Sequence, residues 1–315
     1  MMRERITDLK VLIVGDVMLD QYWFGDVSRI SPEAPVPIVK VERADERAGG
    51  AANVARNIAA LGAKATLLSV VGADDTANRL RKVLDQDGVG HRLEEDPGIR
   101  TTLKLRVIGH QQQMLRIDFE NTPSNHALES KRSHFSQCLE DHDVVIFSDY
   151  RKGALERVQE LLQLTRQSGK LSVVDPKGRS FARYAGANIL TPNRSELAEV
   201  VGGWESDEEM NGKAESVRAD LDLDALLLTM SEQGLRLFRE GDRLHRTAQA
   251  KEVYDVSGAG DTVVAALAVA RGIGEPWERA IDFANAAAGI VVSRLGTSVA
   301  TLDEVLEKRA ELVEQ

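Results

Sequence analysis

The stretch DVSGAGDTVVAAL, residues 255–267, places a carboxylate in a glycine turn at the expected start of a small-residue helix. Backbone N–H groups of such a turn, aided by the helix dipole, can hold an anion. Gly258, Ala259 and Gly260 would supply these N–H groups. If an acceptor hydroxyl lies beside Asp261, the carboxylate can take its proton while the amides neutralise a transferred phosphoryl group. A plain helix-capping carboxylate is the alternative.

Two other phosphate-binding patterns are not met by this chain. The dinucleotide fingerprint needs a third glycine three residues after the second, where Val263 stands, and it normally follows the first strand of a βαβ unit. A Walker A loop, GxxxxGK[ST], does not occur in the sequence. An NAD-dependent oxidoreductase and a P-loop enzyme are therefore disfavoured.

Composition restricts the class of protein and its partners. The chain has 315 residues, of which 43% are hydrophobic and 29% charged, which suits a globular α/β protein. Its net charge of −10 argues against nucleic acid or an anionic membrane as the main partner, because such binding needs a concentrated positive field. The single cysteine, Cys138, excludes an intramolecular disulfide and fits a reducing compartment, so we expect a cytoplasmic protein.

Short β-rich runs alternate with amphipathic segments along most of the chain. The expected strands are 10–15, 64–72, 143–148, 170–175, 187–193 and 224–230, and the expected helices include 51–62, 74–87 and 154–169. This alternation predicts an α/β fold with a mainly parallel central sheet and helices on both faces. Ligands of such folds sit at the carboxyl ends of the strands, so residues that follow each strand are functional candidates.

Two stretches interrupt this alternation. Residues 33–46 and 100–120 look extended, with polar alternation and no crossover helix. We expect them to form a small second sheet that acts as a lid, with segments of about 16–47 and 98–120 inserted in a single domain of residues 1–315. Two surface hairpins packed on the body are the alternative. The exposed edge of a lid sheet also favours a homodimer.

Two motifs together resemble one protein family. DVSGAGDTVVAAL is similar to the C-terminal signature D-T-x-G-A-G-D of the ribokinase-like, or PfkB-type, carbohydrate kinases and departs from it only at Val256, where the signature has Thr. AGGAANVARNIAALG, residues 48–62, resembles the N-terminal signature of the family. The resemblance implies a ribokinase-like fold, ATP with Mg²⁺, Asp261 as catalytic base and Gly258 to Gly260 as an anion hole.

The same resemblance implies a set of sugar-binding residues. Gly49, Gly50 and Asn53 match the positions of the N-terminal signature that hold the sugar. Asp20, at the exit of the first strand, matches an acidic residue that binds sugar hydroxyls, and Asp16 lies on the same loop. Solvated loop carboxylates are the alternative for these two aspartates.

The segment TPNRSE, residues 191–196, matches the N-x-x-E element of the family, which the resemblance links to Mg²⁺ around the nucleotide phosphates. Asn193 and Glu196 would act directly or through water, because Mg²⁺ retains water ligands. A helix capping box is the alternative, and both roles can coexist. A monovalent cation such as K⁺ near Asp255 is left open. The other expected ATP-binding residues are Lys177, Arg194, Ser195, Thr229, Ser231, Gly234, Asn285 and Gly289.

Three further segments narrow the resemblance to heptose-phosphate kinases of lipopolysaccharide precursor synthesis: residues 29–41, 148–155 and 175–179. This resemblance implies transfer of phosphate from ATP to the anomeric O1 of D-glycero-β-D-manno-heptose 7-phosphate. The phosphate that this substrate already carries should meet basic side chains of the lid, and the candidates are Lys104, Arg106 and Arg116, with Lys177 near either phosphate.

Other functions remain open at this stage. A kinase of the same fold that acts on a fructose-, tagatose- or ribose-type sugar is the nearest alternative. A catalytically idle sugar or nucleotide sensor is disfavoured, since it has no need of Asp261. Many relatives fuse the kinase to a nucleotidyltransferase, whereas residues 303–315 read as a helical tail, so we expect a stand-alone kinase.

Overall fold

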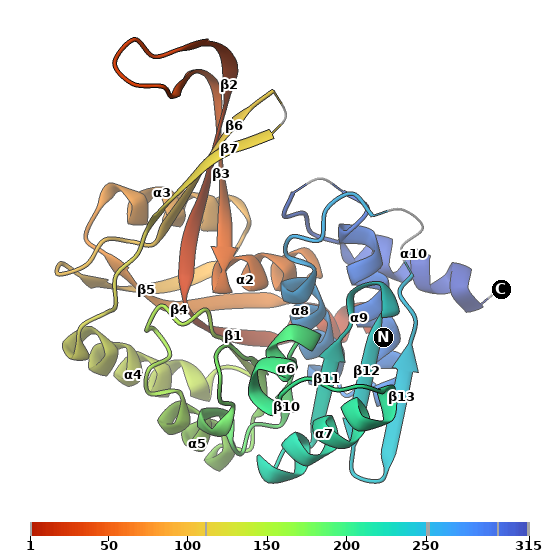
Figure 1. Ribbon diagram of the computed structural model, residues 1–315. Helices are drawn as coiled ribbons and strands as arrows, with labels where there is room; N and C mark the ends of the chain where they lie inside the picture. The colour runs from red at the N-terminus through yellow and green to blue at the C-terminus, as the bar shows by residue number, and fades with distance from the viewer. Residues whose placement is uncertain (1, 111, 250–252, 295, 314–315) are drawn as a thin grey trace.

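The computed structural model describes residues 2–110, 112–249, 253–294 and 296–313 (Figure 1). Gln111, within the predicted lid segment, lies outside the described residues, as do residues 250–252 and 295. Nine strands in the described ranges form the central sheet, in the order β13-β12-β11-β10-β9-β8-β1-β4-β5. Their bounds are β1 Lys10–Gly15, β4 Lys64–Gly72, β5 Gly90–Asp96, β8 Val144–Ser148, β9 Leu171–Asp175, β10 Ile189–Leu190, β11 Ala225–Thr229, β12 Leu235–Arg239 and β13 Asp242–Arg246.

The pairs from β5 to β11 are parallel, and the β11–β12 and β12–β13 pairs are antiparallel. The mainly parallel sheet that the sequence predicts is therefore confirmed. Strand β1 shows why the strands of this sheet appear in the sequence as continuous apolar runs. Val11 and Ile13 belong to one hydrophobic cluster, and Leu12 and Val14 belong to another on the opposite face of the sheet.

Helices cover both faces of this sheet (Figure 1). On one face lie α1 Met2–Asp8, α2 Ala51–Ala60, α3 Asp75–Gln86, α8 Ala259–Gly272, α9 Trp277–Val291 and α10 Leu302–Val313. On the other lie α4 Asn125–Glu140, α5 Val158–Gln167, α6 Arg194–Val201 and α7 Asp207–Asp220. Two short 3₁₀ helices, η1 Ala182–Tyr184 and η2 Ser231–Gln233, follow β9 and β11. No helix in the described ranges is long and apolar enough to cross a bilayer.

A small four-stranded sheet stands away from the layered body (Figure 1). Its strands are β2 Val17–Ile30, β3 Pro37–Gly50, β6 Leu103–Gly109 and β7 Gln112–Phe119, in the order β3-β2-β6-β7. β2 pairs antiparallel with β3 and parallel with β6, and β6 pairs antiparallel with β7. We call this sheet the lid sheet.

The two sheets meet at Asp16, the single residue between β1 and β2. Its backbone N–H donates to Ser148 O of β8 at 3.2 Å, which keeps it on the central sheet, and Val17 then begins the pairing with Gly50 in the lid sheet. In place of the loop expected after the first strand, the chain turns at Asp16 from the central sheet directly into the lid sheet. This passage brings the base of the lid sheet to the carboxyl ends of β1 and β8.

Candidate active site

The glycine turn before α8 has the backbone that its sequence requires. Gly258 precedes the first residue of the helix and has φ 79°, in the left-handed region that favours glycine. A Cβ on Gly258 would lie 2.8 Å from Asn53 Nδ2, so this position is also too crowded for a side chain. Ala259 and Gly260 open the helix, and Asp261 lies buried in its first turn. Backbone N–H groups and a carboxylate are thus presented together.

Asp261 receives a hydrogen bond on each carboxylate oxygen. Asn53 Nδ2 donates to Oδ2 at 2.6 Å, and the Tyr150 hydroxyl donates to Oδ1 at 2.6 Å. Burial raises the pKa of Asp261 to about 6; these two hydrogen bonds oppose that rise, and the nearby charge of Asp20 adds to it. A carboxyl group with a pKa in this range can accept a proton near neutral pH, as a general base must.

The predicted sugar-binding residues of the glycine-rich motif converge where β3 ends and α2 begins. A Cβ on Gly49 would clash with the Asp20 carboxylate, and Gly50 has φ 62° and caps α2. Asn53 follows in the first turn of α2, and its Oδ1 atom is buried without a hydrogen-bond partner. An unsatisfied acceptor next to Asp261 fits a sugar hydroxyl as its missing donor.

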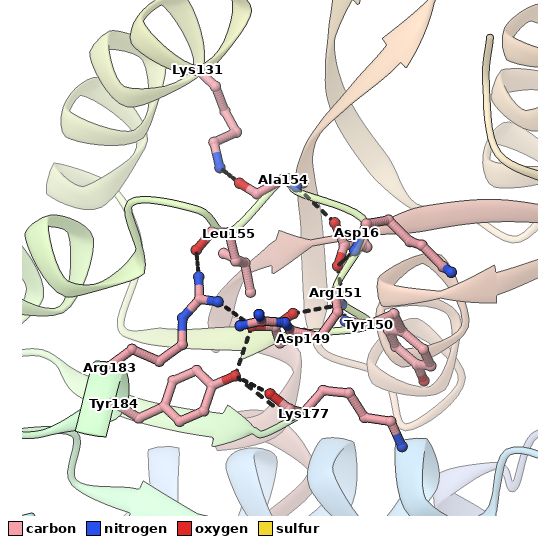
Figure 2. Close-up of polar contacts among 11 residues, drawn as sticks. Asp16, Lys131, Asp149, Tyr150, Arg151, Ala154, Leu155, Lys177, Arg183 and Tyr184 are labelled. Carbon is pink, nitrogen blue, oxygen red and sulfur yellow. Dashed lines mark hydrogen bonds and ion pairs between the residues drawn. The ribbon is translucent and has the colours of Figure 1, made fainter. Parts of the chain in front are cut away.

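Asp16 has a different environment from Asp20. Its Oδ1 accepts a hydrogen bond from the backbone N–H of Ala154 at 2.8 Å, and its Oδ2 accepts from those of Tyr150 at 2.8 Å and Lys152 at 3.0 Å (Figure 2). Burial raises the pKa of Asp16, and these backbone hydrogen bonds oppose the rise. The carboxylate holds the loop after β8, and the geometry gives no support to the predicted sugar contact of Asp16.

A cavity of about 210 Å³ extends from Asp261 to the predicted nucleotide residues. Its lining includes Gly258, Gly260, Lys177, Asn193, Glu196 and Thr229 from the predicted set, together with Asp149, Tyr150, Asp175 and Thr191. Asp175 ends β9, and its pKa is raised well above the usual range by burial and by the charges of Asp261 and Glu196. The cavity gathers the carboxyl groups of Asp149, Asp175, Glu196 and Asp261 around the ammonium group of Lys177.

Asn193 and Glu196 form the capping box that the sequence left as an alternative. Asn193 Oδ1 accepts from the backbone N–H of Glu196 at 2.9 Å, and Glu196 Oε2 accepts from that of Asn193 at 2.9 Å. Glu196 Oε1 also pairs with Lys177 Nζ at 2.9 Å, an interaction that raises the pKa of Lys177. Ser195 Oγ donates to Asn193 Oδ1 at 2.6 Å, while Arg194 Nη1 donates to Gln233 Oε1 at 2.5 Å.

The remaining predicted ATP-binding residues fall into two groups. Thr229 bridges to Asn193 at the end of β11, and the turn after it holds Ser231 at φ 50° and Gly234 at φ 86°. Asn285 and Gly289 lie on α9 instead. Asn285 is buried and donates to Thr247 O at 2.7 Å, and Gly289 packs close to Lys308. These contacts join α9 to the chain after β13 and to α10, and neither residue lines the cavity beside Asp261.

The three basic lid residues that the sequence proposes for the sugar phosphate are all paired with carboxylates. Arg106 Nη1 lies 2.5 Å from Asp20 Oδ1. Lys104 Nζ and Arg116 Nε lie 3.2 and 3.0 Å from the two carboxylate oxygens of Asp118.

Arg47 is a basic residue that sequence reasoning missed. It stands opposite Asp20 in the β2–β3 register, and its guanidinium carbon lies 4.9 Å from the centre of the Tyr22 ring. Within the described part of the chain, Arg47 forms no salt bridge with a carboxylate, but its charge, together with the hydrogen bonds from Ser257 and Gly296, lowers the pKa of Asp255. It lines a cavity of about 1050 Å³ between the lid sheet and the loops of Asp255 and Gly296. A Cβ on Gly296 would clash with this guanidinium.

Comparison with known proteins shows the family of this chain. The family model described as pfkB family carbohydrate kinase matches residues 8–304. The chain is 53% identical over 302 residues to the D-beta-D-heptose 7-phosphate kinase of Bordetella bronchiseptica, with 96% of each protein covered. It is 48% identical over 297 residues to the bifunctional protein HldE of Methylococcus capsulatus, with 94% of this chain covered but only 63% of that protein.

The fold is also found among solved structures. The Arabidopsis thaliana ribokinase complexed with ribose and ATP superposes with a TM-score of 0.76 at 21% identity, with 96% of this chain and 98% of that chain covered. This likeness confirms the predicted ribokinase-like fold. Given the family match over nearly the whole length, the chain belongs to the pfkB family of carbohydrate kinases.

Proposed function

We propose that this chain transfers the γ-phosphoryl group of ATP to the anomeric O1 of D-glycero-β-D-manno-heptose 7-phosphate and yields the 1,7-bisphosphate, a step toward ADP-heptose for the lipopolysaccharide core. The choice of sugar is supported by 53% identity to a heptose 7-phosphate kinase over 96% of each protein. The observation that carries the chemistry is the buried Asp261 carboxylate in the glycine turn before α8. An enzyme of this family that uses a fructose-, tagatose- or ribose-type sugar is the alternative.

The positions of these residues suggest the role of each in phosphoryl transfer. Asp261 removes the proton from the O1 hydroxyl as O1 attacks the γ-phosphorus, and the bond between that phosphorus and the β,γ-bridging oxygen breaks to release ADP. The N–H groups of Gly258 and Gly260 stabilise the charge on the transferred group, and that of Ala259 would join them only by leaving Val256 O, to which it donates at 3.2 Å. Asn53 and Asp20 orient the sugar, with the unpaired Oδ1 of Asn53 accepting from one of its hydroxyls.

The cavity beside Asp261 fits Mg²⁺ carried by the nucleotide. Mg²⁺ prefers oxygen ligands and keeps several waters, and Asp175, Asn193 and Glu196 line this cavity with oxygen atoms. These residues would hold the ion largely through water, because Glu196 is paired with Lys177. When bound, Mg²⁺ neutralises charge on the phosphates.

A monovalent cation such as K⁺ near Asp255 stays a prediction. The carboxylate of Asp255 accepts from the backbone N–H groups of Ser257 and Gly296, each at 2.9 Å, and so ties the start of the glycine turn to the chain after α9.

We place the phosphate of the sugar substrate at Arg47 and Arg106. Both guanidinium groups lie over the Tyr22 ring, at 4.9 and 5.1 Å from its centre. Arg106 pairs with Asp20, whereas Arg47 lies in a cavity that Asp26, Glu42 and Asp255 also line. A phosphate next to Arg47 and Arg106 would gain bidentate hydrogen bonds from their guanidinium groups. Lys104 and Arg116 share Asp118 and would contribute less.

An ATP-consumption assay with a panel of sugar phosphates tests this function. We expect the highest kcat/KM with heptose 7-phosphate, and phosphorus NMR should show a new anomeric phosphate on the product. A clear preference for fructose 6-phosphate would overturn the choice of sugar and leave the family intact. Lack of turnover with every sugar and sugar phosphate, in the presence of Mg²⁺ and K⁺, would overturn the kinase assignment.

A further inference from the structure

The hydroxyl of Tyr150 contacts Asp261 from a part of the chain that neither glycine-rich motif includes. Tyr150 lies two residues after the end of β8, and its hydroxyl donates to Asp261 Oδ1 at 2.6 Å. The pKa of Tyr150 is raised well above its usual value by burial and by the charge of Asp261, so the phenol keeps its proton at any pH at which the enzyme works. A protonated phenol facing a carboxylate is a constant hydrogen-bond donor.

The segment of residues 149–155 that carries Tyr150 is held from three sides (Figure 2). The Asp16 carboxylate accepts three of its backbone N–H groups. Asp149 Oδ2 accepts from the Tyr184 hydroxyl at 2.7 Å. The buried Lys131 donates to Ala154 O from α4. This frame fixes the backbone from which the Tyr150 side chain reaches Asp261, and it does so without any contact to Asp261.

We propose that Tyr150 is a positioning residue for the catalytic base: its hydroxyl fixes the orientation of the Asp261 carboxylate and favours its ionised form. This inference rests on the proposed role of Asp261. A donor to the charged form of a carboxyl group lowers its pKa. Asn53 is the other donor to the Asp261 carboxylate. The negative charge of Asp20, on the lid sheet, raises the pKa of Asp261. Asp175, at the end of β9, also lies near Asp261, whose charge raises the pKa of Asp175.

The substitution Tyr150→Phe removes the donor and keeps the ring. Without it the pKa of Asp261 should rise further, so the acid limb of the kcat/KM profile should move to higher pH by about one to two units, as expected for loss of a hydrogen bond to a charged group. Activity lost near pH 6 should be largely recovered at higher pH, and the KM for ATP should change little. An unmoved acid limb would overturn the proposal.

Tyr184→Phe is the matched control, because it removes a phenol hydroxyl bound to a carboxylate of the same frame, at Asp149. We expect it to lower the melting temperature without moving the acid limb. A shift equal to that of Tyr150→Phe would mean that the frame alone matters and would overturn the specific role of Tyr150. In an Asp261→Asn background, Tyr150→Phe should cause little further loss of turnover, whereas an undiminished loss would show that Tyr150 acts elsewhere.

Two measurements keep the inference testable if Tyr150→Phe folds poorly or the enzyme does not act on the sugar. Incorporation of 3,5-difluorotyrosine at position 150 makes the phenol a stronger donor, so the acid limb should move to lower pH. A carbon NMR titration of the Asp261 carboxyl group in the ligand-free protein, assigned with Asp261→Asn, reads its pKa without any turnover. If the substitutions leave that pKa unchanged, the inference fails even where the kinase activity stands.

Discussion

The Asp261 carboxylate is buried, although its proposed role requires it to be ionised. Burial favours the protonated form, and the hydrogen bonds from Asn53 and Tyr150 offset part of that effect, which leaves the pKa at about 6. A carboxyl group with this pKa is fully ionised only when the pH is well above about 6. It should therefore lose its function as the pH falls through about 6, because protonation removes the acceptor lone pair.

The nearly isosteric substitution Asp261→Asn tests this account at the residue scale. The amide can keep its contacts with Asn53 and Tyr150 but cannot accept a proton, so kcat should fall roughly 10²- to 10⁴-fold. Binding of ATP and sugar phosphate, measured by calorimetry, should change little, and the acid limb seen in the wild-type profile should disappear. Turnover within about tenfold of wild type would remove Asp261 from the role of general base.

At the scale of elements, the pairing of the lid strands decides which side chains share one face of the lid sheet. Asp20 on β2 and Arg47 on β3 are paired in register, and Tyr22 and Arg106 lie on the same face of the sheet. Side chains alternate along a strand, so Arg47 shares this face with Gly49, two residues later. Arg47 lies two residues before Gly49, and this spacing is the signal in the sequence that could have identified it. The spacing is informative only once the pairing of β3 with β2 is known.

The central elements could be predicted because their patterns are local. β4 spans Lys64–Gly72, as its apolar run indicates, and the glycine turns before α2 and α8 lie where the two motifs place them. Tyr150 and Asp175 were missed although each lies at the exit of a buried strand, where ligands are expected. Their partners stand far away in the sequence, at Asp261 and across the cavity, so only the folded chain reveals the contact.

Arg47→Gln tests the contribution of β3. The substitution removes the charge of Arg47, which forms no salt bridge within the described residues, and keeps part of the side chain that packs on Tyr22. We expect the KM for the sugar phosphate to rise by about tenfold or more, because one charge-assisted hydrogen bond to the phosphate is lost. The kcat and the KM for ATP should be nearly unchanged. Arg43→Gln is the matched control on the same strand, since Arg43 lies over Phe24 and already pairs with Asp45. Equal KM values for the two variants would contradict a phosphate site at Arg47.

At the scale of the whole molecule, the lid sheet leaves apolar surface and two strand edges uncovered. The exposed large hydrophobic residues of this sheet are Ile30, Val41, Met114 and Leu115, and Val36 is exposed in the loop between β2 and β3. β3 and β7 form the edges of the sheet. Exposed edges and exposed apolar side chains are costly in a monomer, since they invite association with another chain. A second copy of this chain, docked through its own lid sheet, would cover both features.

We therefore propose that the protein is a homodimer joined through the lid sheets, and light scattering on the eluting peak of a size-exclusion column should give twice the mass of one chain. The double substitution Ile30→Lys and Leu115→Lys places charges on residues that are 64% and 54% exposed, so it should produce a folded monomer. Val253→Lys, at an apolar residue outside the lid sheet that is 62% exposed, should leave the mass unchanged. The two lid charges would raise the cost of pairing because they would be desolvated at the interface. A wild-type protein that elutes as a monomer would contradict the homodimer, and a lid variant that remains dimeric would place the interface outside the lid sheet.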